Sequence, residues 1–102
     1  MAHYCLKKVK NVAQKGKIEY RGRKVQRDIS NLGYELKDVI TCLMALTESD
    51  FHKTLRYNGN DDIDDVYHIE HFNAITDSTD ALYIKFCLVN GNVMIDLASF
   101  HL

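Results

Sequence analysis

The sequence predicts an α+β fold in which N-terminal helices pack on one face of an antiparallel β-sheet of about four to six strands. In residues 1–46, apolar side chains recur at helical spacing, whereas later segments alternate apolar and polar residues. Asn90-Gly91 between two such segments is a strong signal for a β-hairpin. The chain has 102 residues and no proline, and no repeat or linker divides it. We therefore expect a single domain, residues 1–102.

The composition is that of an ordinary globular protein. Hydrophobic residues make up 46% of the chain and charged residues 26%. No apolar run approaches the roughly 20 residues that cross a bilayer, and residues 1–5 have no apolar segment typical of a signal peptide. The three cysteines form no CxxC pair that would indicate a zinc or redox site. We expect a soluble, cytoplasmic protein that does not associate with a membrane.

Three helices are predicted in the first half of the chain. The first apolar stripe covers residues 6–13 and stops before Gly16. A second covers residues 25–32 and stops at Gly33, which is a typical residue after a helix C-terminus. The third and most apolar stripe covers residues 36–46. Each stripe occupies one side of its helix, so all three helices have a face that must be buried.

Extended segments account for the rest of the chain. The expected strands are a short piece at 17–20 and longer pieces at 49–57, 63–72, 82–89 and 92–98, with a turn at 58–62. Since the helices come first and cover one side, the other side of the sheet is expected to be open and partly polar. An open polar face is an obvious place for a functional site.

A two-residue turn at Asn90-Gly91 predicts the register of the last hairpin. Phe86 then faces Ile95, and the apolar side chains of both strands form one face against the helices. In this register Lys85 lies opposite Asp96 on the open face, where a structural ion pair is expected.

The charge is unevenly distributed along the chain, although its net value is −1. Residues 1–36 carry nine basic and three acidic side chains, and residues 37–102 carry four basic and eleven acidic ones. A basic third can bind a polyanion such as nucleic acid. It can also simply reflect lysine-rich helix faces in water, and the pI near 6.5 is low for a dedicated nucleic-acid-binding protein.

Several kinds of site are not supported by the sequence. His68 and His71 are three residues apart on a predicted strand, so their rings point to opposite faces. The acidic residues 61–65 lack the spacing of a calcium loop. Phosphate-binding loops, dinucleotide motifs and the GxSxG motif are absent. We therefore expect no metal ion and no cofactor.

Cleavage of RNA remains chemically accessible without a metal, because the 2′-hydroxyl group is a built-in nucleophile. The protein then needs a base, a cation for the phosphate charge and an acid for the leaving oxygen. Suitable side chains on the predicted strands are His52, Lys53, Arg56, Tyr67, His68, His71 and Tyr83. By themselves these residue types permit this chemistry but do not demonstrate it.

The segment Leu46-Thr47-Glu48-Ser49-Asp50-Phe51-His52-Lys53 resembles a Leu-Ser-Glu-Ser-Asp-Phe-Tyr-Lys stretch of the MqsR family. Leu32-Gly33, Asp65-Val66-Tyr67 and Tyr83-Ile84-Lys85 match further family segments in the same order. The resemblance implies a RelE-like fold and a sequence-preferring, metal-independent endoribonuclease toxin, an mRNA interferase of a bacterial type II toxin–antitoxin system. Its expected partners are single-stranded mRNA and a cognate antitoxin protein.

The resemblance also implies site residues. Lys53 and Tyr83 match the family's proposed catalytic lysine and tyrosine. Asp64 stands where the family has a glutamine, His52 where it has a tyrosine, and His68 where it has an arginine. The histidines could take over proton transfer near neutral pH. The predicted catalytic residues are Lys53, Tyr83, His68, His52 and Asp64, and the predicted RNA-binding residues are Arg56, Tyr67 and Lys85.

One geometric condition follows for the predicted site. Simple alternation in 49–57 places Lys53 on the side of Phe51, facing the core, whereas Tyr83 faces away from it. The two can meet one phosphate only if the strand contains a bulge or lies at an open edge. Two alternatives to the ribonuclease remain: a catalytically weakened binding module of the same fold that acts only through its protein partner, and an unrelated structural α+β domain.

Overall fold

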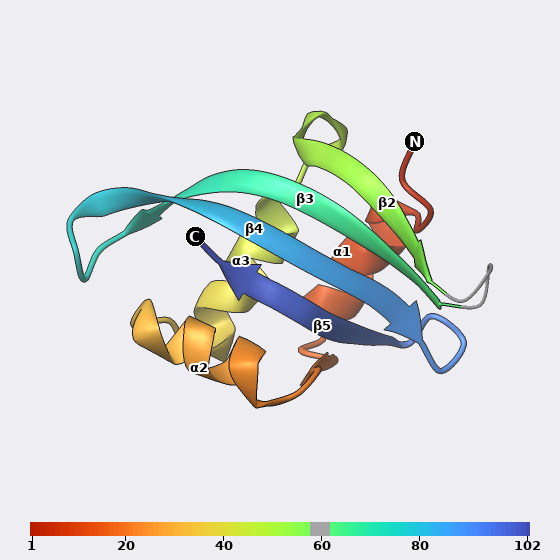
Figure 1. Cartoon of the computed structure of the whole chain (residues 1–102), viewed down its shortest axis with the longest axis horizontal. Coiled ribbons are helices and arrows are strands. Elements are labelled where there is room, and N and C mark those ends of the chain that lie inside the picture. Colours follow the sequence, from red (N-terminus) through yellow and green to blue (C-terminus); the bar gives the residue numbers. More distant parts are fainter. Residues whose placement is uncertain (58–61) are drawn as a thin grey trace.

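The computed structural model describes residues 1–57 and 62–102, and it contains three α-helices on one face of a five-stranded sheet (Figure 1). The helices are α1 (Leu6–Gln14), α2 (Arg23–Asn31) and α3 (Leu36–Ala45), followed by a 3₁₀ turn at Glu48–Asp50. The strands are β1 (Ile18–Tyr20), β2 (Phe51–Tyr57), β3 (Asp62–Asn73), β4 (Ser78–Val89) and β5 (Met94–His101). The predicted α+β class is confirmed. Residues 58–61 of the predicted turn lie outside the described residues.

The three helices lie where the apolar stripes predict them. Val9, Val25 and Leu43, one from each helix, are at most 1% exposed and belong to the same core. α3 begins with a capping box, in which the side chains of Glu35 and Asp38 bond each other's backbone N–H groups. None of the helices in the described part of the chain is long and apolar enough to span a membrane.

The sheet has the strand order β1-β5-β4-β3-β2. Neighbours from β5 to β2 are antiparallel, but β1 runs parallel to β5, with Ile18 beside Ile95. The sheet is therefore mixed, which corrects the expectation of a purely antiparallel one. A strand of three residues carries no sequence signal for its direction. Its direction is decided only by the tertiary structure, in which β5, at the end of the chain, pairs with it.

The register of the last hairpin differs from the prediction by two residues. Phe86 pairs with Leu97 and Leu88 with Ile95, because the loop is longer than Asn90-Gly91. Asn90, Gly91 and Asn92 all have positive φ angles, of 55°, 73° and 67°. Up to the Phe86–Leu97 pair this even shift keeps each side chain on its predicted face. A β-bulge between Lys85 and Phe86 then adds one residue to β5, so that Lys85 pairs with Ser99 and Tyr83 with His101.

The ion pair predicted between Lys85 and Asp96 is wrong as a consequence of this shift. Lys85 lies opposite Ser99, whereas Asp96 lies opposite Cys87 and pairs with Arg21.

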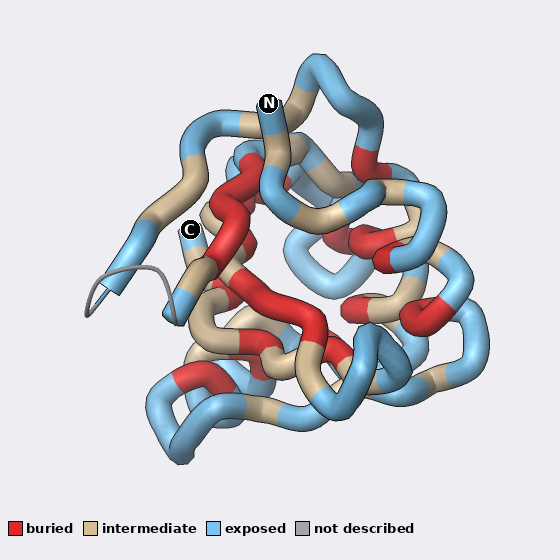
Figure 2. The backbone as a smooth tube through the Cα atoms, turned by 90° about the vertical axis from the view of Figure 1, so that its right-hand side faces the viewer, coloured by how far each residue is buried: buried red, intermediate tan, exposed pale blue. Residues whose placement is uncertain are grey.

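The core lies between the helices and the covered face of the sheet. Ile84, Phe86, Ile95, Leu97 and Phe100 are fully buried there. Figure 2 shows the buried parts of the chain facing the interior, while the outer turns are exposed. Because the helices cover only one face, the side chains on the opposite face of the strands remain accessible to a ligand.

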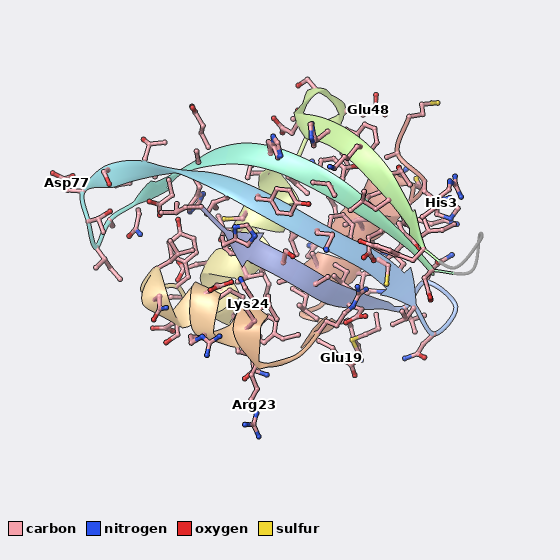
Figure 3. The ribbon with its side chains drawn as sticks, viewed as in Figure 1. His3, Glu19, Arg23, Lys24, Glu48 and Asp77 are labelled. Atoms are coloured by element: carbon pink, nitrogen blue, oxygen red, sulfur yellow. The ribbon has the colours of Figure 1, made fainter. Side chains whose placement is uncertain are left out.

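A buried carboxylate joins the N-terminus to the sheet. Asp65 is 0% exposed, and its oxygens accept hydrogen bonds from the backbone N–H groups of His3 (3.0 Å) and Tyr4 (2.8 Å). The hydroxyl of Thr54 donates a third hydrogen bond at 2.6 Å. Figure 3 shows the side chains of the N-terminal segment, with His3 labelled, near the end of β2.

Replacing Asp65 by alanine is expected to lower the free energy of unfolding by about 3 kcal/mol, because three donors lose a charged acceptor. Urea unfolding of the purified protein measures this change. Glu70→Ala is the matched control, since it removes an exposed carboxylate from the same strand and should change stability by less than about 0.5 kcal/mol. Equal losses for the two variants would contradict the structural role of Asp65.

Candidate functional site

A bulge in β2 decides which side chains share the open face. Phe51 pairs with Tyr67 and Lys53 with Val66, so the register shifts at His52. Phe51 therefore faces the helices, where its ring lies 5.6 Å from that of Tyr67. Beyond the bulge, Lys53 points to the opposite face of the sheet. The structure thus contains the bulge that the predicted meeting of Lys53 and Tyr83 requires.

Four rings cross the open face in a row, one from each of four neighbouring strands. His52 on β2 is stacked on His68 on β3, with ring centroids 4.2 Å apart. His68 lies 5.6 Å from Tyr83 on β4, and Tyr83 is stacked on His101 on β5 at 5.1 Å. We call these four side chains the ring row. Three of its members are histidines, the residue type most often used for proton transfer in catalysis.

A row of two lysines lies beside the ring row. Lys53 and Lys85 both pair with Val66, which lies between them and is fully buried. Strand spacing places the two lysine Cα atoms about 10 Å apart. Lys85 lies about 7 Å along β4 from Tyr83, and Lys53 directly follows His52 in the chain. The Lys85 Nζ atom is 3.5 Å from the Tyr57 hydroxyl and 6.0 Å from the centre of its ring. We call Lys53 and Lys85 the lysine row.

The electrostatic environment favours a neutral imidazole at His52. The pKa of His52 is lowered, first by partial desolvation and then by the nearby His68 and Lys53. A lowered pKa keeps this ring unprotonated, and able to accept a proton, at neutral pH. Within residues 1–57 and 62–102, no group of three or more histidine, cysteine or carboxylate side chains is arranged to hold a metal ion.

A family model described as "Motility quorum-sensing regulator, toxin of MqsA" matches residues 1–101. The chain belongs to this family. The resemblance to the MqsR family that the sequence indicates is thereby confirmed, and the family description names a cognate antitoxin as the partner. A search of curated proteins finds no significant match.

Asp64 of this MqsR-family toxin is not a free carboxylate. It is 2% exposed, and both of its oxygens accept hydrogen bonds from the guanidinium group of Arg21 at 2.9 Å. This contact is the largest cause of the raised pKa of Arg21. The structure therefore gives Asp64 a fixed partner instead of the open position that a general base requires. The pairing also compensates a charge that would otherwise repel phosphate.

Two of the predicted RNA-binding residues lie away from the open face. Tyr67 is 1% exposed on the helix-covered face, stacked on Phe86 at 5.7 Å, and burial raises its pKa to about 12. Arg56 is exposed but alternates with Lys53 along β2, so it points to the side of Thr54. Both residues are removed from the predicted set, and Lys85 is the member that the structure places beside Lys53.

His68 and His71 on β3 point to opposite faces of the sheet, as their spacing predicts. His68 belongs to the ring row, whereas His71 lies on the opposite face with its ring 5.7 Å from that of Tyr34. The two rings therefore cannot share a ligand.

Two residues at the site were missed by the sequence analysis. His101 stacks on Tyr83 because the shifted hairpin register pairs these two residues. Simple alternation from Ile95 would place His101 on the covered face, and only the bulge between Lys85 and Phe86, which no sequence pattern indicates, brings it opposite Tyr83. Arg21 reaches the open face from the chain just after β1, and no sequence pattern indicates its contacts. By contrast, Arg23 points from α2 away from the sheet (Figure 3).

Proposed function

We propose that this protein is a sequence-preferring, metal-independent endoribonuclease that cleaves single-stranded mRNA in the cytoplasm and is neutralised by its antitoxin. The observation that supports this proposal is the position of the ring row beside the lysine row on the uncovered face of the sheet. The lysines offer positive charge for the phosphates, and the rings offer groups for proton transfer.

The reaction requires proton transfer on two sides of the phosphorus atom. The 2′-oxygen attacks phosphorus, the bond to the 5′-oxygen breaks, and a 2′,3′-cyclic phosphate and a 5′-hydroxyl result. His52, kept neutral by its lowered pKa and stacked on His68, takes the proton from the 2′-hydroxyl. On the other side, the Tyr83 hydroxyl gives its proton to the 5′-oxygen, and His101, which is stacked on Tyr83, returns a proton to the phenolate through solvent.

Three side chains complete this scheme. The Nδ1 atom of His101 lies 2.8 Å from the backbone oxygen of Leu102 and donates to it, so Nε2 is the atom available for proton transfer. In this scheme the Tyr83 hydroxyl contacts the phosphate on the side away from His52. Lys53 compensates the negative charge that builds up on the phosphate in the transition state.

The proposal is tested by incubating the purified protein with a long RNA and mapping the cuts by primer extension. We expect discrete cuts at a recurring short sequence, new 5′-hydroxyl ends, and the same pattern in excess EDTA. If the protein binds its antitoxin tightly but leaves the RNA intact, the ribonuclease proposal fails and the alternative of a binding module takes its place. If cleavage requires an added divalent cation, the metal-independent mechanism is incorrect.

Replacing Tyr83 by phenylalanine keeps the ring row but removes the hydroxyl group that contacts the phosphate. We expect the cleavage rate to fall about 10²-fold, with an unchanged melting temperature. Tyr57→Phe is the matched control, because its hydroxyl lies beside Lys85 rather than in the ring row. Single-turnover cleavage of a labelled oligoribonucleotide measures both variants, and equal rates for the two would remove the Tyr83 hydroxyl from the mechanism.

A further inference from the structure

We propose that the guanidinium plane of Arg21 is a stacking platform for one nucleobase of the bound RNA, in a subsite next to the lysine row. The inference rests on the proposed binding of single-stranded RNA to the open face. It assigns a ligand to a surface that the catalytic scheme leaves unused.

Arg21 is held across three strands by contacts along the edges of its guanidinium group. Its Nε atom donates to Asp96 at 2.8 Å, and its two Nη atoms donate to Asp64 at 2.9 Å. One Nη atom also lies 3.3 Å from the Sγ atom of Cys87. The backbone N–H of Arg21 donates to Leu97 at 2.8 Å and fixes the start of the side chain. The group therefore lies in one orientation, with every nitrogen engaged by the protein.

What Arg21 offers to a ligand is consequently its flat face. Its side chain is 42% exposed even though its nitrogens are occupied. Arginine planes stack on nucleobases, and such stacking is a common way to hold the unpaired bases of single-stranded RNA. Since the plane is already fixed, little side-chain entropy is lost when a base stacks on it.

The local charge favours a base over a phosphate at this position. One guanidinium group faces two carboxylates, Asp64 and Asp96, so these three side chains together carry a net negative charge. A second phosphate would be repelled here, whereas an uncharged base would not. The arrangement differs in this respect from the lysine row, which is suited to a phosphate.

The space beside Arg21 is large enough for a base and is continuous with the lysine row. A cavity of about 770 Å³ is lined by residues that include Arg21, Tyr57, Lys85, Cys87 and Asp96. Lys85 and Tyr57 thus border both the cavity and the lysine row. Cys87 follows Lys85 by two residues on the same face, a separation of about 7 Å. A base on Arg21 therefore belongs to a nucleotide adjacent to the phosphate that Lys85 contacts.

The test uses a short oligonucleotide methylated at every 2′-oxygen, which binds but cannot be cut. Abasic sites are introduced at each position in turn, and affinity is measured by fluorescence anisotropy. We expect one abasic position to weaken binding to the wild type about tenfold. Arg21→Lys keeps the charge but loses the plane, so it should bind the intact oligonucleotide about tenfold more weakly. The same abasic site should then cost this variant nothing further.

Controls separate stacking from loss of structure. Arg23→Lys, on α2, should retain the wild-type abasic penalty. If Arg21→Lys does not fold, Arg21→Met/Asp64→Asn removes the plane and the buried carboxylate together, so that only Asp96, which is partly exposed to water, loses its partner. In the wild type, the NMR signal of the Arg21 Nε–H group should move upfield when the intact oligonucleotide binds, and should not move with the abasic one.

Two results would overturn the proposal. One is an abasic penalty that is the same in the Arg21 variants and the wild type, and the other is the absence of binding by the methylated oligonucleotide. Neither result depends on cleavage, because the probe cannot react. A protein that stacks this base but leaves a long RNA uncut would retain the Arg21 subsite and refute only the nuclease activity.

Discussion

Replacing Lys53 by alanine is expected to reduce RNA cleavage by about 10³-fold while leaving the protein folded. The ammonium group lies on the open face beyond the β2 bulge, next to the ring row. There it compensates the charge that develops on the phosphate, which is stronger in the transition state than in the bound RNA. Because Lys53 is exposed, its removal leaves no buried group without a partner. Primer extension and thermal unfolding, run side by side, measure the two effects.

Arg56→Ala is the matched control for this experiment. It removes the same charge from the same strand, but from the side that faces away from the ring row. We expect its cleavage rate to stay within about twofold to threefold of the wild type, because a distant exposed charge acts only through screened electrostatics. Full cleavage by Lys53→Ala would exclude Lys53 from the mechanism. Equal losses in both variants would show that only the overall charge matters.

Replacing His52 by glutamine is expected to lower the cleavage rate by about 10² to 10³-fold, because the general base is lost. In the wild type, the rate should rise with pH as His52 loses its proton. Its pKa is lowered by desolvation and by the neighbouring His68 and Lys53. The rising limb should therefore lie below the ordinary histidine pKa of about 6.5, and activity should fall only when the pH drops through this lowered value. Single-turnover rates measured between acidic and neutral pH test this.

His68→Phe sharpens the test, since it retains a stacked ring but removes one of the causes that, after desolvation, lower the His52 pKa. The rising limb should then move to higher pH, towards the ordinary value. His71→Gln is the control, because His71 lies beside Tyr34 on the other face and should leave the profile unchanged. A rising limb that persists unaltered in His52→Gln would assign the base to a different residue.

Much of the fold follows from local patterns in the sequence. The three helices and the long strands were predicted because each has an apolar periodicity that is visible within a few residues of chain. The faces of β4, and of β5 up to Leu97, were also predicted correctly, although the register there was wrong by two residues, since an even shift leaves each side chain on its own side. Tyr83 and Lys85 could therefore be placed on the open face without knowing their partners.

The composition of the site was less predictable. Tyr67 and Arg56 are of the right chemical types and lie on the right strands, but on the wrong side of them. The β2 bulge reverses the expected alternation before Lys53, and nothing in the residues 49–57 indicates its position. His101 reaches the open face because the β4–β5 pairing contains a bulge between Lys85 and Phe86, which reverses the alternation of β5 after Leu97.

By itself, the sequence determined the order and type of the elements, the face on which most strand residues lie, and membership of the MqsR toxin family. Only the tertiary structure decided that Lys53 points to the open face, that four rings line up across four strands, and that Arg21 binds Asp64. The reason is the range of the interactions involved. Periodicity is a local property of the chain, whereas the Arg21–Asp64 pair joins residues 43 positions apart and forms only when the strands assemble.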